Sequence, residues 1–400
     1  MCGLKKGKDQ VQKPRFLEAA GLTFLGMLTA LAVLLPGAAS AAPGAPGVGP
    51  VKEFGSFPIP ASFPCEVIVD HQGNLWTDQF TGNAMGEVDP ATGKITEVPL
   101  PTLGGQPGGQ NLGPEGNIYF VEVGGNSIGV LDPETHEITT HPFPWANVEV
   151  GLPSTGSLLL NNGLGVPFDD TFGADGKLYF TMIGLNAIGS FDIKTGEWAK
   201  YPIPTALSGP IAMERGPDNT VAITEGVSSK IALFHTDSHT WSEYTIPTPL
   251  SLPGGLTVSP DGKYLYFGET LGQKIGRLEP ISGEIKEFPL PITLGLGNPL
   301  PSPGQLRFGS DGKLYIMQGT FDAGNKIGQL DVETGAYHYL ETPTPLSSPC
   351  DLNNALPGKI IFGEFTGNRI GYFSIPDTTD ISGAIPPYNE GLPDRFPSGS

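Results

Sequence analysis

The chain has 400 residues, among them 57 Gly and 41 Pro, and only 16% of its residues are charged. It carries 22 Lys and Arg against 41 Asp and Glu, a net charge of −19. A surface this acidic repels nucleic-acid backbones and anionic bilayers, so both classes of partner are excluded. The Gly and Pro content without helical periodicity indicates an all-β protein.

The first 41 residues have the layout of a secretory signal. Five basic residues between Lys5 and Arg15 precede an apolar run over residues 19–35, and small residues follow at 39–41. The sequence predicts a cleaved signal peptide over 1–41 and a mature protein that is secreted or lies in the secretory lumen. A retained membrane anchor is the alternative, because the run is only slightly short of a bilayer span. Residues 42–50 are expected to be a linker.

Residues 51–376 repeat one unit, which residues 253–291 show most clearly. Four short strands are expected there, separated by Asp-Gly and Ser-Gly turns and ended by prolines. The second-strand phrase occurs seven times, and a phrase such as Asn325-Lys-Ile-Gly328 follows it each time. Four strands per unit at a period above 40 residues predict a seven-bladed β-propeller.

Only six fourth strands follow their own blades. The seventh blade ends at Ile375-Pro376, and a near copy of the missing strand lies at the other end of the chain, from Val51 to Phe54. We expect this N-terminal strand to complete the last blade and close the ring, which removes exposed sheet edges. Residues 377–400 are then a C-terminal tail.

Two of the three cysteines occupy the same place in their blades. Cys65 opens the first strand of blade one and Cys350 opens that of blade seven, while Cys2 lies in the predicted signal. Ring closure makes blades one and seven neighbours. The pair is therefore a disulfide candidate in an oxidising compartment, with two free thiols as the alternative.

One end of the channel, called the mouth here, should carry the functional residues. The first strands begin there, the second strands end there, and the insertions at 145–166 and 292–302 are expected there as lids. Residues that depart from the repeat at these places are the candidates. The catalytic candidates are Gln110, Asp170, Gln305 and Asp351, and the substrate-binding candidates are Glu66, Phe168, Met182, Gln318 and Trp145.

Acidic residues end five of the seven second strands, as we align them: Asp78, Glu122, Glu225, Glu269 and Glu364. A residue repeated in most blades favours a structural role, so no metal or other cofactor is expected. If a metal does bind, Mg²⁺ or Ca²⁺ on Glu66, Asp170, Glu225 and Glu269 is the alternative. All six histidines are expected in turns of the opposite face or in outer strands, so the mouth lacks the usual neutral-pH base.

The phrases Gly73-Asn-Leu-Trp-Thr-Asp78 and Ile285-Lys-Glu-Phe-Pro-Leu-Pro291 resemble the blades of the streptogramin B (virginiamycin B) lyases. The resemblance covers residues 51–376 and implies a seven-bladed propeller. It also implies opening of a cyclic depsipeptide ester by Mg²⁺-assisted elimination, with histidines at the mouth. Glu225 and Glu269 match the acidic positions of that motif, but the histidines have no counterpart here.

The secretory signal, the cysteine pair and the histidine-free mouth also make the chain similar to fungal hetero-Diels–Alderases, which join a tropolone-derived quinone methide to a terpene. That resemblance implies a cofactor-free, ring-forming step on an apolar terpenoid or polyketide. A pericyclic step needs a pocket that holds two partners in a reactive pose, and no base or metal. We expect this function in natural-product metabolism, for a monomer that binds a small molecule and has no membrane partner after signal cleavage.

Three alternatives remain open at this point. One is a Mg²⁺-dependent lyase. Another is a metal-dependent lactonase similar to propellers of the senescence marker protein type, with Glu66, Asp170 and Asp351 as ligands. The third is a secreted binding propeller without catalysis.

Overall fold

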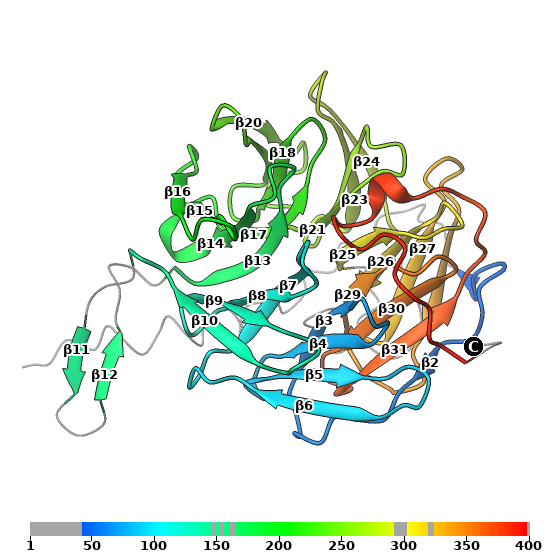
Figure 1. Ribbon diagram of the computed structural model, residues 1–400. Helices are drawn as coiled ribbons and strands as arrows, with labels where there is room; N and C mark the ends of the chain where they lie inside the picture. The colour runs from blue at the N-terminus through cyan, green and yellow to red at the C-terminus, as the bar shows by residue number, and fades with distance from the viewer. Residues whose placement is uncertain are drawn as a thin grey trace, which may run out of the picture. The chain divides into compact units, whose positions relative to one another are not determined.

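Seven four-stranded antiparallel sheets stand in a ring around a central channel, with the first strand of each blade innermost (Figure 1). Each first strand contacts the first strands of both neighbouring blades, and the last one, β29, contacts β3. The computed structural model describes residues 42–145, 149–152, 156–159, 165–291, 302–318 and 324–397. The all-β, seven-bladed prediction is confirmed. The predicted signal, half of the predicted lid at 145–166 and nearly all of that at 292–302 lie outside the described residues.

The strands occupy equivalent positions in every blade. The first strands are β3 (Pro64–Val69), β7 (Pro107–Leu112), β13 (Pro167–Phe172), β17 (Pro210–Arg215), β21 (Pro253–Val258), β25 (Pro303–Phe308) and β29 (Pro349–Asn353). The second strands are β4 (Leu75–Gln79), β8 (Ile118–Glu122), β14 (Leu178–Met182), β18 (Thr220–Glu225), β22 (Leu265–Glu269), β26 (Leu314–Gln318) and β30 (Lys359–Glu364).

The third strands are β5 (Ala84–Val88), β9 (Ser127–Leu131), β15 (Ala187–Phe191), β19 (Lys230–His235), β23 (Lys274–Glu279), β27 (Lys326–Leu330) and β31 (Arg369–Ser374). The fourth strands are β6 (Ile95–Pro99), β10 (Ile138–Pro142), β16 (Trp198–Pro202), β20 (Thr240–Thr245), β24 (Glu284–Pro289), β28 (Tyr337–Glu341) and β2 (Lys52–Glu53). Outside the blades, β11 (Glu149–Leu152) pairs with β12 (Gly156–Leu159), and two short 3₁₀ turns are η1 (Ile183–Leu185) and η2 (Ser382–Ala384).

The N-terminal strand closes the ring as the sequence predicts. In blade seven β2 pairs antiparallel with β31, with Lys52 opposite Tyr372 and Glu53 opposite Gly371. Within the segment expected to be a linker, β1 (Ala42–Pro43) adds a short parallel strand to the outer edge of β28 in blade six.

The Ile-Gly phrase of the third strands has a packing cause. A Cβ added at Gly129 would overlap the ring of Phe120 on the second strand, and Gly189, Gly276 and Gly371 meet an equivalent Phe. In blade four the smaller Ile223 replaces the Phe, and the paired residue is Ala232 instead of Gly. In these five blades the combined volume of the two positions stays nearly constant. In blades one and six, where Thr77 and Ile316 face the glycine, the rings of Phe57 and Tyr337 lie beside it instead.

The asparagines at the third-strand starts fix the connections at the mouth. Asn368 adopts a left-handed backbone, with φ of 58°. Its amide donates to the carbonyls of Phe57 and Ile59, and its oxygen accepts the Ser62 N–H at 3.0 Å. Asn83 and Asn186 make similar bonds in their blades. One side chain thus binds the connection to the next blade.

The C-terminal tail crosses the face opposite the mouth (Figure 1). Thr378 and Thr379 donate backbone N–H bonds to Ser310 in blade six, and η2 packs against β21 in blade five. Tyr388 packs edge-on against Phe172 in blade three. Further contacts are made by Arg395, 3.0 Å from Asp89 in blade one, and by Phe396, which packs on Tyr372 in blade seven. The tail therefore contacts five blades.

Candidate functional site

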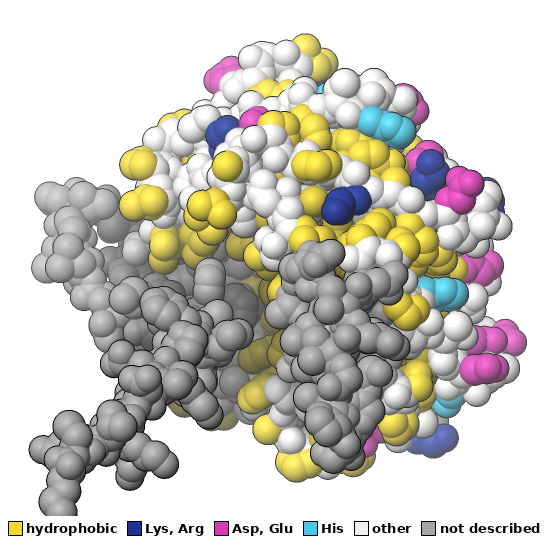
Figure 2. Space-filling model, turned by 90° about the vertical axis from the view of Figure 1, so that its left-hand side faces the viewer, with side chains coloured by type: hydrophobic (Ala, Val, Ile, Leu, Met, Phe, Trp, Pro, Cys, Tyr) yellow, Lys and Arg dark blue, Asp and Glu magenta, His cyan; other side chains and the backbone are white. Residues whose placement is uncertain are grey.

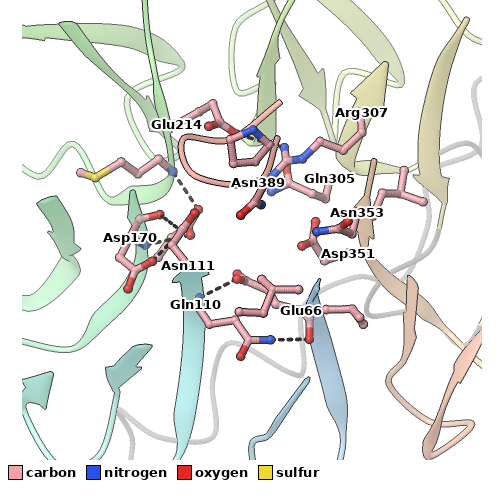
Figure 3. Close-up of a pocket in the computed structure, with 16 residues that line it drawn as sticks. Glu66, Gln110, Asn111, Asp170, Glu214, Gln305, Arg307, Asp351, Asn353 and Asn389 are labelled. Carbon is pink, nitrogen blue, oxygen red and sulfur yellow. Dashed lines mark hydrogen bonds and ion pairs between the residues drawn. The ribbon is translucent and has the colours of Figure 1, made fainter. Parts of the chain in front are cut away.

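A small cavity lies inside the channel, between the first strands and the C-terminal tail (Figure 3). It has a volume of about 20 Å³, which is room for about one water molecule. Its walls are mostly polar. They are formed by Glu66, Val67, Ile68, Gln110, Asn111, Asp169, Asp170, Met213, Glu214, Gln305, Arg307, Asp351, Leu352, Asn353, Pro386 and Asn389.

A β-bulge near the start of the first strands aims these side chains into the channel. In β3 the pairing with β4 shifts between Pro64 and Val67, and the other first strands shift at the same place. The residue two positions after the starting proline lies inside this irregularity, which changes the direction of its side chain. Glu66, Asp169, Gln305 and Asp351 hold this position in blades one, three, six and seven, and all four border the cavity.

The second strands bind the bulged backbone. The carboxylate of Asp78 accepts the N–H groups of Cys65 and Glu66, at 3.2 and 2.7 Å. At the same register of blade three, the hydroxyl of Thr181 accepts the Asp169 N–H at 3.1 Å. These bonds compensate for the ladder bonds that the bulge interrupts.

Two carboxylates are tied to the next blade. Glu66 Oε2 accepts the Gln110 N–H at 2.7 Å, and Asp169 Oδ2 accepts the Met213 N–H at 2.8 Å. The other oxygen of Asp169 accepts the Asp170 N–H at 2.8 Å. These bonds position the carboxyl groups before any ligand binds.

Arg307 is the cation of the cavity wall. Its guanidinium lies 3.3 Å from the Glu214 carboxylate and donates to the carbonyl of Leu256 at 3.0 Å. The other cavity-lining acids are Glu66, Asp169, Asp170 and Asp351, so carboxyl groups outnumber cationic groups. Proton uptake by some of these acids relieves the repulsion between them.

The pKa values follow from this crowding. Burial, together with Asp169 and Asp351, raises the pKa of Glu66 well above its usual range. Burial and the nearby Asp351 and Glu214 raise the pKa of Asp169 to about 7, although the Met213 N–H opposes the shift. Burial also raises the pKa of Asp351, against the lowering effect of Arg307. Burial in the cavity therefore favours the protonated form of all three acids.

Several buried oxygens of the cavity wall have no hydrogen-bond partner among the described residues. They belong to Gln110, Asp170, Gln305, Asp351 and Asn389. Gln110 and Asp170 stand where other blades carry apolar residues such as Val67 and Leu352. Burial raises the pKa of Asp170 well above its usual range, even though the Asn111 amide donates to its carboxylate at 2.7 Å. A wall with unused acceptors is suited to a bound polar group or water.

Of the nine residues predicted from the sequence, Glu66, Gln110, Asp170, Gln305 and Asp351 line the cavity. The others lie elsewhere. Phe168 is part-exposed at the mouth, Met182 is fully buried in an apolar cluster, Gln318 bonds to the Tyr337 hydroxyl, and Trp145 packs on Phe143. Met182 and Trp145 thus take part in packing between blades two and three.

The sequence alignment of blade one was wrong by one residue. Gln79, not Asp78, pairs with the starting proline of the first strand, as Glu122 does in blade two. Successive side chains of a strand lie on opposite sides of the sheet. The Asp78 side chain therefore lies on the other side from the glutamates, where it accepts the N–H groups of Cys65 and Glu66. Glu122 accepts bonds from the hydroxyls of Ser127 and Thr140, and Glu225 accepts one from Ser228. These two glutamates thus stabilise their own blades.

The residues proposed as metal ligands do not fit a metal ion. Glu66 and Asp170 line the cavity, whereas Glu225 and Glu269 lie at second-strand ends in two other blades. In the described parts of the chain, no three His, Cys, Asp or Glu side chains are placed to hold an ion together. Mg²⁺ and Ca²⁺ need several oxygen ligands at one point. We therefore assign the chemistry of the cavity to its own side chains.

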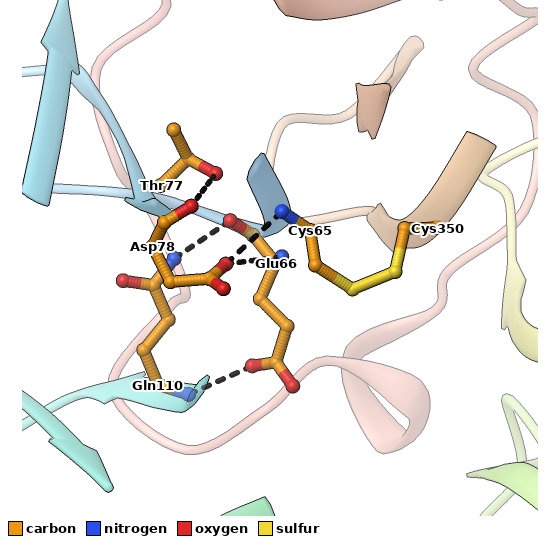
Figure 4. The surroundings of a disulfide bond; sticks show 6 residues. All are labelled: Cys65, Glu66, Thr77, Asp78, Gln110 and Cys350. Atoms are coloured by element: carbon orange, nitrogen blue, oxygen red, sulfur yellow. Dashed lines mark hydrogen bonds between the residues drawn. A yellow bond between two sulfur atoms is a disulfide. The ribbon is translucent and has the colours of Figure 1, made fainter. Parts of the chain in front are cut away.

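The predicted disulfide is confirmed. Cys65 and Cys350 are bonded across 285 residues, with their Cα atoms 5.0 Å apart (Figure 4). The bond joins blades one and seven beside Glu66, at the end of the ring where the two termini of the propeller meet. A structural disulfide indicates an oxidising environment. Among the described residues, no helix is long and apolar enough to cross a membrane.

Residues 159–388 match the model of the virginiamycin B lyase family. A catalytically inactive virginiamycin B lyase from Staphylococcus aureus, solved with quinupristin, has 26% identity and a TM-score of 0.69, covering 82% of this chain and 99% of that chain. A streptogramin B lyase has 25% identity and a TM-score of 0.69, covering 82% and 98%. Hydrazine synthase from Kuenenia stuttgartiensis, at 17% identity and a TM-score of 0.60 over 79% and 96%, shares the fold alone. No curated protein matches the chain.

Proposed function

The chain belongs to the virginiamycin B lyase family, and from this we propose that it is a small-molecule enzyme that breaks a carbon–oxygen bond by elimination. The observation that carries the proposal is Glu66. Its carboxyl group borders the cavity, is held through one oxygen by Gln110, and has a strongly raised pKa. A buried carboxyl group with a raised pKa is a stronger base than a solvated one, so we assign to Glu66 the role of the missing histidine.

The elimination needs no reactant besides the substrate and Glu66. The Glu66 carboxylate takes a proton from the carbon next to the one that carries the ester oxygen. The electrons of that C–H bond form the C=C bond, and the ester C–O bond breaks with its electron pair on the departing carboxylate. Because the cavity has room for about one water, the body of the substrate lies outside it, at the mouth.

A second candidate is the cofactor-free ring-forming reaction. The favouring observation is the group of cavity acids whose pKa burial raises well above the usual range, Glu66 and Asp170 among them. A protonated carboxyl group donates a hydrogen bond to a polarised carbonyl oxygen, which lowers the barrier of a hetero-Diels–Alder addition. The elimination needs Glu66 as a base, whereas the ring-forming reaction needs it as a hydrogen-bond donor.

The experiment compares the parent protein with Glu66→Gln on quinupristin and related cyclic depsipeptides. Elimination opens the ring without a change of mass, whereas a lactonase adds the mass of one water. We expect Glu66→Gln to lower kcat by about 100-fold or more, with Glu87→Gln, on the third strand of the same blade, as the control. An unchanged kcat in Glu66→Gln would reject the lyase mechanism.

We also propose that the protein is secreted or works in the secretory lumen. The disulfide and the N-terminal sequence pattern support this proposal. N-terminal sequencing of the protein from the culture medium tests it, with cleavage expected near residue 41. Recovery of the full chain in the cytosol with free thiols would contradict it.

A further inference from the structure

The two faces of the propeller differ in charge. The described connections and hairpin turns of the mouth face contain no Asp, Glu, Lys or Arg. They span residues 54–63, 80–83, 100–106, 123–126, 183–186, 203–209, 226–229, 246–252, 270–273, 342–348 and 365–368. Nearly all hairpin turns of the opposite face carry charged residues, for example at 89–94, 132–137, 192–197 and 331–336. In the side view of Figure 2, most of the visible acidic side chains lie along the right-hand edge, which is the face turned toward the viewer in Figure 1.

Exposed leucines stand on this uncharged face. One occurs in each of four connections between blades, with exposed side-chain fractions that are large for this residue type. They are Leu103 (99%), Leu207 (82%), Leu250 (78%) and Leu346 (46%), called the mouth leucines here. Val227, Leu271 and Phe168 add further exposed apolar side chains to the same face. A repeated apolar group around one opening marks an interaction surface.

The backbone shows that folding does not require these leucines. Leu207, Leu250 and Leu346 have φ values of 54°, 55° and 55°, a left-handed conformation that a branched side chain disfavours. Gly104 has the equivalent place before blade two, three residues ahead of the starting proline. Glycine is thus accepted there, yet three blades carry leucine. The backbone of the connections therefore does not explain why these exposed positions carry leucine.

We propose that the mouth face docks on a lipid bilayer whose headgroups are zwitterionic. The cations that reach the mouth connections, Lys230, Lys274 and Arg369, are each paired with a glutamate. The face therefore has no net attraction to anionic lipid, and the net charge of −19 repels it. The disulfide indicates the oxidising side of a membrane, whereas the negative surface potential belongs to the cytoplasmic leaflet. Single leucines on separate loops insert into a fluid interface without needing a complementary pocket. This proposal departs from the expectation of no membrane partner after signal cleavage.

A second copy of the chain fits this face less well. A dimer interface needs packed, complementary surfaces, and the mouth leucines stand on separate connections. Two copies meeting mouth to mouth would also cover both channels. Docking on a bilayer instead turns each channel toward the phase in which an apolar substrate is concentrated. The inference does not depend on which reaction the protein catalyses.

The test is sedimentation of the protein with phosphatidylcholine vesicles in the absence of substrate. We expect Leu207→Asn and Leu250→Asn each to lower the partition coefficient about tenfold. Because Asn tolerates the left-handed backbone, both variants should melt at or above the parent temperature. The matched control is Ile281→Asn, which changes an exposed apolar residue (91%) on the opposite face and should bind like the parent.

Three results would overturn the proposal. They are a parent protein that does not bind phosphatidylcholine, leucine variants that bind as well as Ile281→Asn, and stronger binding when phosphatidylserine is added. Light scattering at increasing protein concentration tests the alternative that the mouth face forms a dimer. We expect it to give the mass of one chain. A dimer that the leucine variants abolish would assign the face to a second copy. Failure of this test leaves the Glu66 mechanism untouched, since quinupristin turnover is measured without vesicles.

Discussion

Glu66 and Gln110 bind each other in both directions. The carboxylate of Glu66 accepts the backbone N–H of Gln110 at 2.7 Å, and the side-chain amide of Gln110 donates to the backbone carbonyl of Glu66 at 2.8 Å. The same amide reaches the Trp76 carbonyl at 3.1 Å. The pair joins blades one and two, so the scaffold fixes the carboxyl group that we assign to proton transfer.

Stability should fall as the pH rises from about 4 to about 7. Burial raises the pKa of both Asp78 and Asp169 to about 7, so the folded chain binds protons that the unfolded chain has released. Each such group contributes its full stabilisation at pH values below the pKa that it has in the unfolded chain. This contribution is lost once the pH has risen through the pKa that the group has in the folded chain. The change is about 1.4 kcal/mol per pKa unit. Thermal unfolding from pH 4.5 to pH 8 measures it, and Asp169→Asn should flatten the curve.

Removal of the disulfide should lower the free energy of unfolding by weakening the contact between blades one and seven. Cys65→Ser with Cys350→Ser leaves the β2–β31 pairing intact but removes a bond across 285 residues. The chain-entropy model sets an upper limit of about 5 kcal/mol, and we expect less because β2 already restrains the ends. Denaturant unfolding of the double variant and of the parent gives the difference. Equal midpoints would show that strand pairing alone closes the ring.

Deletion of residues 377–400 should open the channel at the face opposite the mouth. Pro386 and Asn389 leave the cavity wall, and the apolar contacts of Leu392 and Phe396 are lost. We expect a lower melting temperature and a weaker dependence of stability on pH, since water then solvates the channel acids. The less disruptive Asn389→Ala serves as the comparison, because it keeps the tail across the blades. A truncated protein with the parent's pH profile would show that the tail does not seal the cavity.

Chelation should leave the protein unchanged. The carboxylates of Glu66 and Asp169 are engaged by backbone N–H groups, and Glu225 and Glu269 lie in separate blades. We therefore expect EDTA treatment to shift neither the melting temperature nor the activity. Loss of activity that Mg²⁺ or Ca²⁺ restores would establish a metal site and favour the metal-dependent lyase or lactonase.

The repeat made most of the fold predictable. Seven copies of one phrase gave the blade number, the isolated strand at residues 51–54 gave the closure, and Cys65 and Cys350 shared one place in the repeat. Five of the nine residues proposed from the sequence line the cavity, and each was chosen because it departs from the repeat near a first-strand start. The register of blade one was wrong because Asp78 was chosen for its charge. The repeat glycine lies six residues before the strand end in other blades, as Gly116 does before Glu122, and this spacing points to Gln79.

Other parts of the site gave no local signal. Arg307 and Glu214 come from blades six and four and meet only across the channel. Asn389 lies in a tail without repeat or periodicity, and its place in the cavity depends on contacts with five blades. Sequence spacing records neighbours within a blade, whereas these residues meet through the geometry of the closed ring.

The two ends of the propeller also set the order of its biosynthesis. The strand at residues 52–53 leaves the ribosome first, but its partner at 369–374 follows about 300 residues later. At 5–20 residues per second this delay is about 15–60 s. Throughout that interval the first segment has no partner and the growing array has two open edges. Protection of these edges is therefore needed during synthesis, whereas the bond between Cys65 and Cys350 can form only on a nearly complete chain.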